Sequence, residues 1–126
     1  MRTEEHEKSL EEHKKIIFKW ALEVQGLEKS QRTIGLHTSR AALDLFAIFL
    51  HKKKIIDEGF QLNHRWFKSQ KVSSMLPEFE NKEKIIISLV ELENLCEKLS
   101  YGAEKPVANA ERAIKLFLEI EELVKK

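Results

Sequence analysis

The sequence contains little cysteine, glycine and proline. Of its 126 residues, one is cysteine, four are glycine and two are proline. The single cysteine, Cys96, excludes an intramolecular disulfide framework and a zinc cluster built from several cysteines. Small β-sandwiches and barrels need many special turns, for which glycine and proline are the usual residues. The shortage of both therefore favours an all-α fold.

An excess of one charge and a long apolar run are also missing. The 22 Lys and Arg residues nearly match the 21 Asp and Glu residues, which leaves a net charge of +1. Proteins that bind nucleic acid mainly through a global positive field have a clear basic excess, so only a local basic patch remains open here. The N-terminal residues are too charged for a signal peptide, and no apolar run approaches the roughly 20 residues of a membrane span. We therefore expect a cytoplasmic protein with no membrane contact, in a reducing compartment.

Sequence motifs for several common chemistries are absent as well. The four glycines are isolated, which excludes the Gly-rich loops that bind dinucleotides and nucleoside triphosphates. None of the five histidines belongs to a Glu-x-x-His pair of the di-iron type, and the HExxH motif of zinc proteases is missing. His6 and His13 can share a helix face, but they are expected at the solvated surface. We therefore expect neither a metal nor a cofactor.

The spacing of apolar residues predicts an up-and-down bundle of four or five helices in one domain that spans residues 1–126. The expected helices cover about residues 3–27, 30–56, 81–101 and 106–124, with a further short helix near 68–75. N-caps are expected at Ser30 and Asn81, and Pro106 fits the first turn of the last helix. Gly59 suits a left-handed C-cap after the second helix, and Tyr101 with Gly102 ends the third.

Three of the expected helices carry an apolar stripe that should face the core. The stripes consist of Leu10, Ile17, Ala21 and Val24; of Ile85, Leu89, Leu92, Cys96 and Leu99; and of Ala110, Ala113, Phe117, Ile120 and Val124. The second helix is different, because Asp44 is the one polar residue in the run AALDLFAIFL. A helix that is apolar on every side must be covered on every side. It is therefore either the central element of the bundle or its dimerisation surface.

A line of polar residues interrupts this apolar helix. His37, Arg40, Asp44 and His51 follow one another at spacings of three, four and seven, so their side chains share a face. One interpretation is a structural ion pair between Arg40 and Asp44 with flanking histidines. The other is a cleft in which Arg40 binds phosphate, His37 or His51 transfers a proton, and Asp44 orients the histidine. The sequence leaves both interpretations open.

Basic and aromatic residues alternate in the segment NHRWFK, which covers residues 63–68. His64, Arg65 and Trp66 are candidates to contact single-stranded nucleic acid, with the cations on phosphates and the ring stacked on a base. The alternative is that Trp66 and Phe67 plug the end of the bundle while His64 hydrogen-bonds within the loop.

The order of these motifs resembles the HEPN superfamily, in particular its stand-alone archaeal-type members. The matching segments are SRAALDLFAIFLHKKKIIDEGF, NHRWFKS and LENLCEKLSYG, and the likeness spans about residues 30–124. The resemblance implies a HEPN-like bundle, of the type of nucleotidyltransferase substrate-binding subunits, that forms a side-by-side homodimer. Active members are metal-independent RNases whose motif is an Arg followed, after a short spacer, by a His near the end of the third long helix. Other members lack activity and associate with nucleotides or RNA, often beside a small nucleotidyltransferase.

This sequence departs from the RNase motif of the superfamily. Cys96 stands where the resemblance places the Arg, and Tyr101 stands where it places the His. A thiol cannot replace a guanidinium group on phosphate, and a phenol is a poor proton shuttle at neutral pH. The departure therefore argues against an enzyme.

The sequence is interpreted as a non-catalytic homodimeric module that associates with a nucleotide, RNA or a small nucleotidyltransferase partner. The expected binding groove is lined by Arg40, Asp44, Glu97 and Tyr101. The alternative function is a toxin-like, metal-independent RNase that uses Arg40 with His37, His51 or His64.

Overall fold

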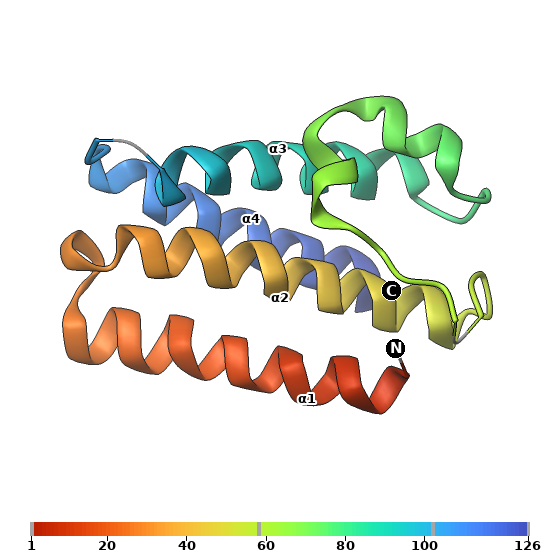
Figure 1. Cartoon of the computed structure of the whole chain (residues 1–126), viewed down its shortest axis with the longest axis horizontal. Helices are drawn as coiled ribbons and strands as arrows, with labels where there is room; N and C mark the ends of the chain where they lie inside the picture. The colour runs from red at the N-terminus through yellow and green to blue at the C-terminus, as the bar shows by residue number, and fades with distance from the viewer. Residues whose placement is uncertain (1, 58, 102, 126) are drawn as a thin grey trace.

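Four long helical rods lie side by side in the computed structural model of the chain, which describes residues 2–57, 59–101 and 103–125 (Figure 1). The rods are α1 (Thr3–Lys14) with its wider π-helical continuation η1 (Lys15–Gln25), then α2 (Gln31–Lys52), α3 (Lys82–Ser100) and α4 (Val107–Lys125). Short 3-10 turns are η2 (Leu27–Lys29), η3 (His64–Lys68) and η4 (Gln70–Met75). Consecutive rods run in opposite directions, so α1 begins and α4 ends at the same end of the bundle (Figure 1). No strand occurs in the described ranges, and the predicted all-α helical bundle is confirmed.

α2 is the central helix of the bundle. α1, α3 and α4 all pack against it, and Figure 1 shows it between α1 and α3. Its larger buried apolar side chains are Ile34, Leu45, Phe46, Phe49 and Leu50. Most of the apolar surface of this helix is thus covered within one chain, as expected for the central element of the bundle, although Leu36 is 45% exposed. Even so, no helix among the described residues has the length and apolar character needed to cross a membrane.

The predicted apolar stripes form the core, with one exception. The stripes of α3 and α4 bury Ile85, Leu89, Leu92, Cys96, Leu99, Ala110, Ala113, Phe117 and Ile120, and Val124 packs against them. The first rod buries Leu10, Ile17 and Ala21, but Val24 is 63% exposed and its predicted core position is wrong. A π-helical turn holds more residues than an α-helical one, so in η1 the step of three from Ala21 does not return to the core.

The end of α2 lies earlier than predicted. The helix ends at Lys52, and Lys54 takes the left-handed position with a φ of 58°. The Lys54 N–H donates to the carbonyl oxygen of His51 at 3.0 Å, and the Ile55 N–H donates to that of Leu50 at 2.9 Å. These are the paired bonds of a Schellman motif. The C-cap predicted at Gly59, five residues after Lys54, is therefore wrong.

Ser30 and Asn81 occupy the predicted N-cap positions, but neither side chain caps its own helix. Ser30 Oγ donates instead to the carbonyl oxygen of Gly26 at 2.7 Å. Gly26 has a φ of 95°, a conformation that glycine adopts easily, and it reverses the chain between η1 and α2. Gly102, expected at the end of α3, lies outside the described residues.

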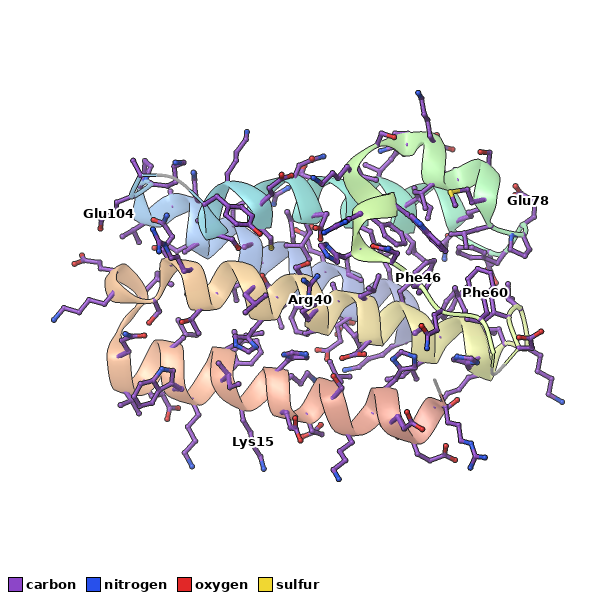
Figure 2. All side chains as sticks on the ribbon, viewed as in Figure 1. Lys15, Arg40, Phe46, Phe60, Glu78 and Glu104 are labelled. Atoms are coloured by element: carbon purple, nitrogen blue, oxygen red, sulfur yellow. The ribbon has the colours of Figure 1, made fainter. Side chains whose placement is uncertain are left out.

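The segment between α2 and α3 crosses beside both helices (green in Figure 1). Phe67 is buried there and meets Phe46 edge-on, with ring centroids 5.9 Å apart. Trp66 is half-buried and packs against Phe60, which Figure 2 labels near the end of the bundle. Both aromatic residues therefore contribute to the packing of this segment, which also places η3 over one face of α3.

Candidate anion-binding site

A cavity of about 690 Å³ opens where α2, α3 and η3 meet. Its cationic lining comes from two elements, with Arg32 and Arg40 on α2 and Arg65 and Lys68 on η3. Glu93 and Glu97 of α3 also line the cavity, together with His64 and Tyr101. Figure 2 labels Arg40 near the middle of α2, the helix that lies between α1 and α3. A chain of almost neutral net charge thus concentrates several cations in one place.

The two carboxylates of the cavity are already engaged by other side chains. Lys68 Nζ lies 3.1 Å from Oε1 of Glu97 in an exposed ion pair. Glu93 is buried, and its two oxygens accept hydrogen bonds from Ser39 and His64. These contacts leave the arginines of the cavity without a carboxylate partner.

Three guanidinium groups in the cavity have no partner among the described residues. The side chains of Arg32, Arg40 and Arg65 make no hydrogen bond or ion pair within that part of the chain. By contrast, Arg112 on α4 lies 2.7 Å from Glu91 and close to Glu119. Guanidinium groups bind carboxylates and phosphates through paired N–H donors. The cavity is therefore suited to an anion.

Glu93 holds His64 in a defined orientation at the edge of the cavity. The Nδ1–H of His64 donates to Oε1 of Glu93 at 2.8 Å, and Ser39 Oγ donates to Oε2 at 2.6 Å. Because Nδ1 is used in this bond, Nε2 of His64 is the nitrogen that can exchange a proton or a hydrogen bond with a ligand. Ser39 bonds to the carboxylate and not to the histidine, so the arrangement does not activate the hydroxyl as a nucleophile.

Cys96 is a packing residue at the base of the cavity. It is buried against α2, and Sγ lies 3.0 Å from Thr38 Oγ1. Burial raises the pKa of the Cys96 thiol to about 12, although the contact with Thr38 acts in the opposite direction. A thiol in this environment stays protonated and unreactive at neutral pH, which agrees with the core position predicted for it.

The cavity brings together most of the residues that the sequence singled out. Arg40, Glu97 and Tyr101 of the expected groove line it, and so do His64 and Arg65 of the loop. A neighbouring hollow shares Arg40, His64 and Arg65 and adds Trp66 to its lining. Arg32 and Lys68 are further cations of the same cavity, and they were not among the predicted site residues.

Asp44 lies elsewhere, in the contact between α1 and α2. Its Oδ1 accepts a hydrogen bond from Nδ1 of His6 at 2.8 Å, and its Oδ2 lies 3.8 Å from Nε2 of His13. The proposed ion pair with Arg40 is not formed in the described structure, because the carboxylate faces α1 while Arg40 lines the cavity. Asp44 therefore does not line the groove that the sequence predicts.

His37 and His51 also face α1. Nδ1 of His37 lies 2.8 Å from Nδ1 of His13, and the rings of His51 and His6 have centroids 5.8 Å apart. The predicted surface position of His6 is wrong, since this side chain is buried, and His13 is half-buried. A signal was present in the sequence: the two histidines of α1 are spaced by seven residues, and so are Asp44 and His51 on α2.

The described residues contain no group of three or more His, Cys, Asp or Glu side chains that could hold a metal ion. Comparisons of the chain with family models, curated proteins and solved structures found no match. The likeness to the HEPN superfamily therefore stays a prediction that depends on the sequence pattern.

Proposed function

We propose that the chain is a non-catalytic binding module whose cavity takes a phosphate group of a nucleotide or of RNA. The observation that carries this proposal is the convergence of Arg32, Arg40 and Arg65, without partners among the described residues, on one cavity. Phosphate offers several acceptor oxygens in the geometry that guanidinium groups bind best. The local concentration of cations supplies the attraction that the net charge of the whole chain does not.

Aromatic side chains flank the cationic cavity and suit the base of such a ligand. Tyr101 is 71% exposed at one side, and Trp66 lines the adjoining hollow at the other. A base stacked on an aromatic ring contributes about 1–3 kcal/mol. Phosphate contacts in the cavity combined with stacking at its edges favour a nucleotide or a single strand over a simple inorganic anion.

The homodimer and the small nucleotidyltransferase partner implied by the resemblance belong to the same proposal. Leu36 and Tyr101, both exposed, border the cavity on the surface that a second protein would cover. Sedimentation of the purified protein measures the dimer directly. A monomer at micromolar concentration would remove the homodimer from the proposal and leave the cavity as a site within one chain.

Titration of labelled single-stranded RNA of about ten nucleotides, and of ATP, tests the binding function. Fluorescence anisotropy or calorimetry should show saturable binding by the wild-type protein. Arg40→Ala should weaken it about tenfold to a hundredfold, since a hydrogen bond to a charged group contributes about 1.5–3 kcal/mol. Arg112→Ala is the matched control, because Arg112 is engaged with Glu91 on another surface. Absence of saturable binding, or equal weakening by both variants, would contradict the proposal.

A second candidate function is RNA cleavage by Arg40 with His64. One observation favours it: His64 shares the cavity with Arg40, whereas His37 and His51 face α1. In this reaction Nε2 of His64 takes the proton of the 2′-hydroxyl, the 2′-oxygen attacks phosphorus, and the 5′-oxygen leaves with a proton from water. Arg40 would stabilise the negative charge on the phosphate oxygens.

RNA incubated with the protein in EDTA tests this second function. Cleavage should leave 2′,3′-cyclic phosphate ends and should be lost in both His64→Ala and Arg40→Ala. His37→Ala should leave the rate unchanged, because His37 lies outside the cavity. If the protein cleaves no more than a mock-purified control, the enzyme is eliminated and the binding module stands alone.

A further inference from the structure

The contact between α1 and α2 contains four of the five histidines of the chain. His6 and His13 come from α1, and His37 and His51 come from α2. Asp44 lies among them and is 7% exposed. None of these five residues has a place in the cavity, so the proposed binding function leaves the cluster unexplained.

This contact has little apolar area on the α1 side. The buried residues of α1 are His6 and Leu10, and only in the continuation η1 do Ile17 and Ala21 add an apolar contribution. Helices in a bundle normally dock through a continuous apolar stripe. In α1, one of the two buried residues is a histidine, and imidazole hydrogen bonds to α2 supply part of the contact. The docking of α1 therefore depends on the protonation of these rings.

The bond between His13 and His37 limits how many protons the contact can accept. Their Nδ1 atoms lie 2.8 Å apart, so one nitrogen must donate and the other must accept. A neutral or singly protonated pair satisfies this requirement. When both rings are protonated, both Nδ1 atoms carry hydrogen, the bond is lost and two like charges meet.

The surrounding charges cannot compensate for two additional protons. Among the described residues, Asp44 is the one carboxylate in hydrogen-bond contact with the cluster, and it already accepts from His6. Its other oxygen is 3.8 Å from His13, which supports a single further positive charge there. Glu12 of α1 and Arg40 of α2 act on His13 with opposite signs. On α4, the carboxylate of Glu121 already forms an ion pair with Lys14 of α1.

The pKa shifts of His13 and His37 agree with this limit on the number of protons. Burial lowers the pKa of His13, although Asp44 acts in the opposite direction, and burial together with His13 lowers the pKa of His37. Both rings are thus neutral at neutral pH when α1 is docked. Once α1 moves away, the rings reach water and return to their ordinary protonation, so acid favours the undocked helix.

We propose that the histidine cluster makes the docking of α1 on α2 proton-dependent, so that α1 detaches in mild acid while α2, α3 and α4 stay packed. In the described part of the chain, the apolar core that joins these three helices contains no histidine, and His37 and His51 lie on the side of α2 that faces α1. This proton-dependent docking of α1 does not depend on the ligand proposed for the cavity.

Hydrogen exchange of the full chain between about pH 7.5 and about pH 5, corrected for the intrinsic exchange rate, tests the proposal. Peptides covering Thr3–Lys14 should lose at least about tenfold of their protection in acid, which corresponds to one pKa unit of linkage. Peptides from α3 and α4 should keep theirs. Unchanged protection of α1, or an equal loss in all helices, would overturn the proposal.

The double variant His13→Leu/His37→Leu replaces both partners of the central bond with apolar groups. It should keep α1 protected at about pH 5, to within about twofold of its value at about pH 7.5. Arg112→Ala is the control, since Arg112 lies on α4 and pairs with Glu91 outside the cluster, and it should show the wild-type response. A double variant that still releases α1 in acid would overturn the proposal.

NMR titration of the wild-type protein provides a second measurement that needs no variant. The ring signals of His13 and His37 should titrate together with the amide signals of α1. Amide changes in α1 whose midpoint differs from that of both rings would count against the histidine cluster, even if the double variant failed to fold.

Discussion

His64 on the crossing segment and Glu93 on α3 are joined by a hydrogen bond of 2.8 Å, although they are separated by 29 residues in sequence. The same carboxylate also accepts from Ser39 on α2. One buried acid thereby ties three elements together at the wall of the cavity. Buried carboxylates are stable only when they are hydrogen-bonded or paired, so the buried position of Glu93 at the cavity requires its contacts with His64 and Ser39.

Glu93→Ala should destabilise the fold by about 1–3 kcal/mol, since it leaves the Ser39 hydroxyl and a half-buried imidazole without their acceptor. Urea unfolding followed by circular dichroism measures the change. Glu91→Ala is the control, because Glu91 is half-exposed and its pair with Arg112 should contribute less than about 1 kcal/mol. Equal losses in the two variants would show that Glu93 has no special structural role.

The stability of the whole protein should fall in mild acid. The pKa values of His13 and His37 are lowered in the folded state from an ordinary 6.5, chiefly by burial. Below that value the unfolded chain binds more protons than the folded one, so the free energy of unfolding decreases as the pH falls. The loss begins near the ordinary histidine value and ends once both rings are protonated in the folded state as well.

Urea midpoints measured from about pH 7.5 down to about pH 5 check this dependence. The decrease should be smaller in His13→Leu/His37→Leu, which carries neither titrating ring. A midpoint that stays constant or rises in acid would contradict the assigned direction of both shifts.

Gly35→Ala should destabilise the protein despite the higher helix propensity of alanine. A β-carbon at this position would lie 2.8 Å from Cβ of Leu99 and 3.0 Å from the carbonyl oxygen of Cys96. Since α2 and α3 are in contact there, one helix must move, and such overpacking costs about 1–3 kcal/mol. The movement would also widen the cavity that both helices line.

The matched control is Gly59→Ala, where a β-carbon would meet only Asp57 at 3.6 Å. Gly59 does not have positive φ, so alanine should be neutral or stabilise by up to about 1 kcal/mol through the unfolded state. Thermal unfolding of both variants decides the matter: a Gly35→Ala protein as stable as the wild type would mean that the helices adapt without cost.

Much of the fold follows from the spacing of apolar residues. The stripe from Ile85 to Leu99 and the run around Phe46 fix which faces are buried, because a helix must cover its apolar side. Phe67 is buried, as the packing interpretation of its loop predicts, while His64 and Arg65 of the same loop line the cavity.

The candidate site could be predicted only in part. Arg40 and His64 stand out by residue type, but the meeting of the α2 arginines with the cations of η3 depends on the path of η3 across α2 and α3. Packing against α2 and α3 sets the path of η3, and no local sequence pattern indicates it. Asp44 was assigned to Arg40 because the two are four residues apart on one helix. The direction of its side chain is set by α1, whose histidines were expected to face solvent.

The end of α2 was misplaced for a local reason. The sequence favours a left-handed C-cap at the nearest glycine, whereas the helix uses Lys54 with a φ of 58°. A β-carbon in this conformation meets the following carbonyl oxygen, which costs roughly 1–2 kcal/mol for an ordinary residue. The protein accepts this strain because the paired bonds of Lys54 and Ile55 satisfy carbonyls at the helix end.

Lys54→Gly should therefore stabilise the protein by about 0.5–1 kcal/mol, as relief of the strain outweighs the greater freedom of glycine in the unfolded chain. Lys53→Gly is a close control, since Lys53 is also exposed and has an ordinary φ of −84°. That variant gains no relief and should lose about 0.5–1 kcal/mol. Chemical unfolding of the two variants should thus show shifts of opposite sign. Shifts of the same sign would mean that the left-handed backbone at Lys54 is not a source of strain.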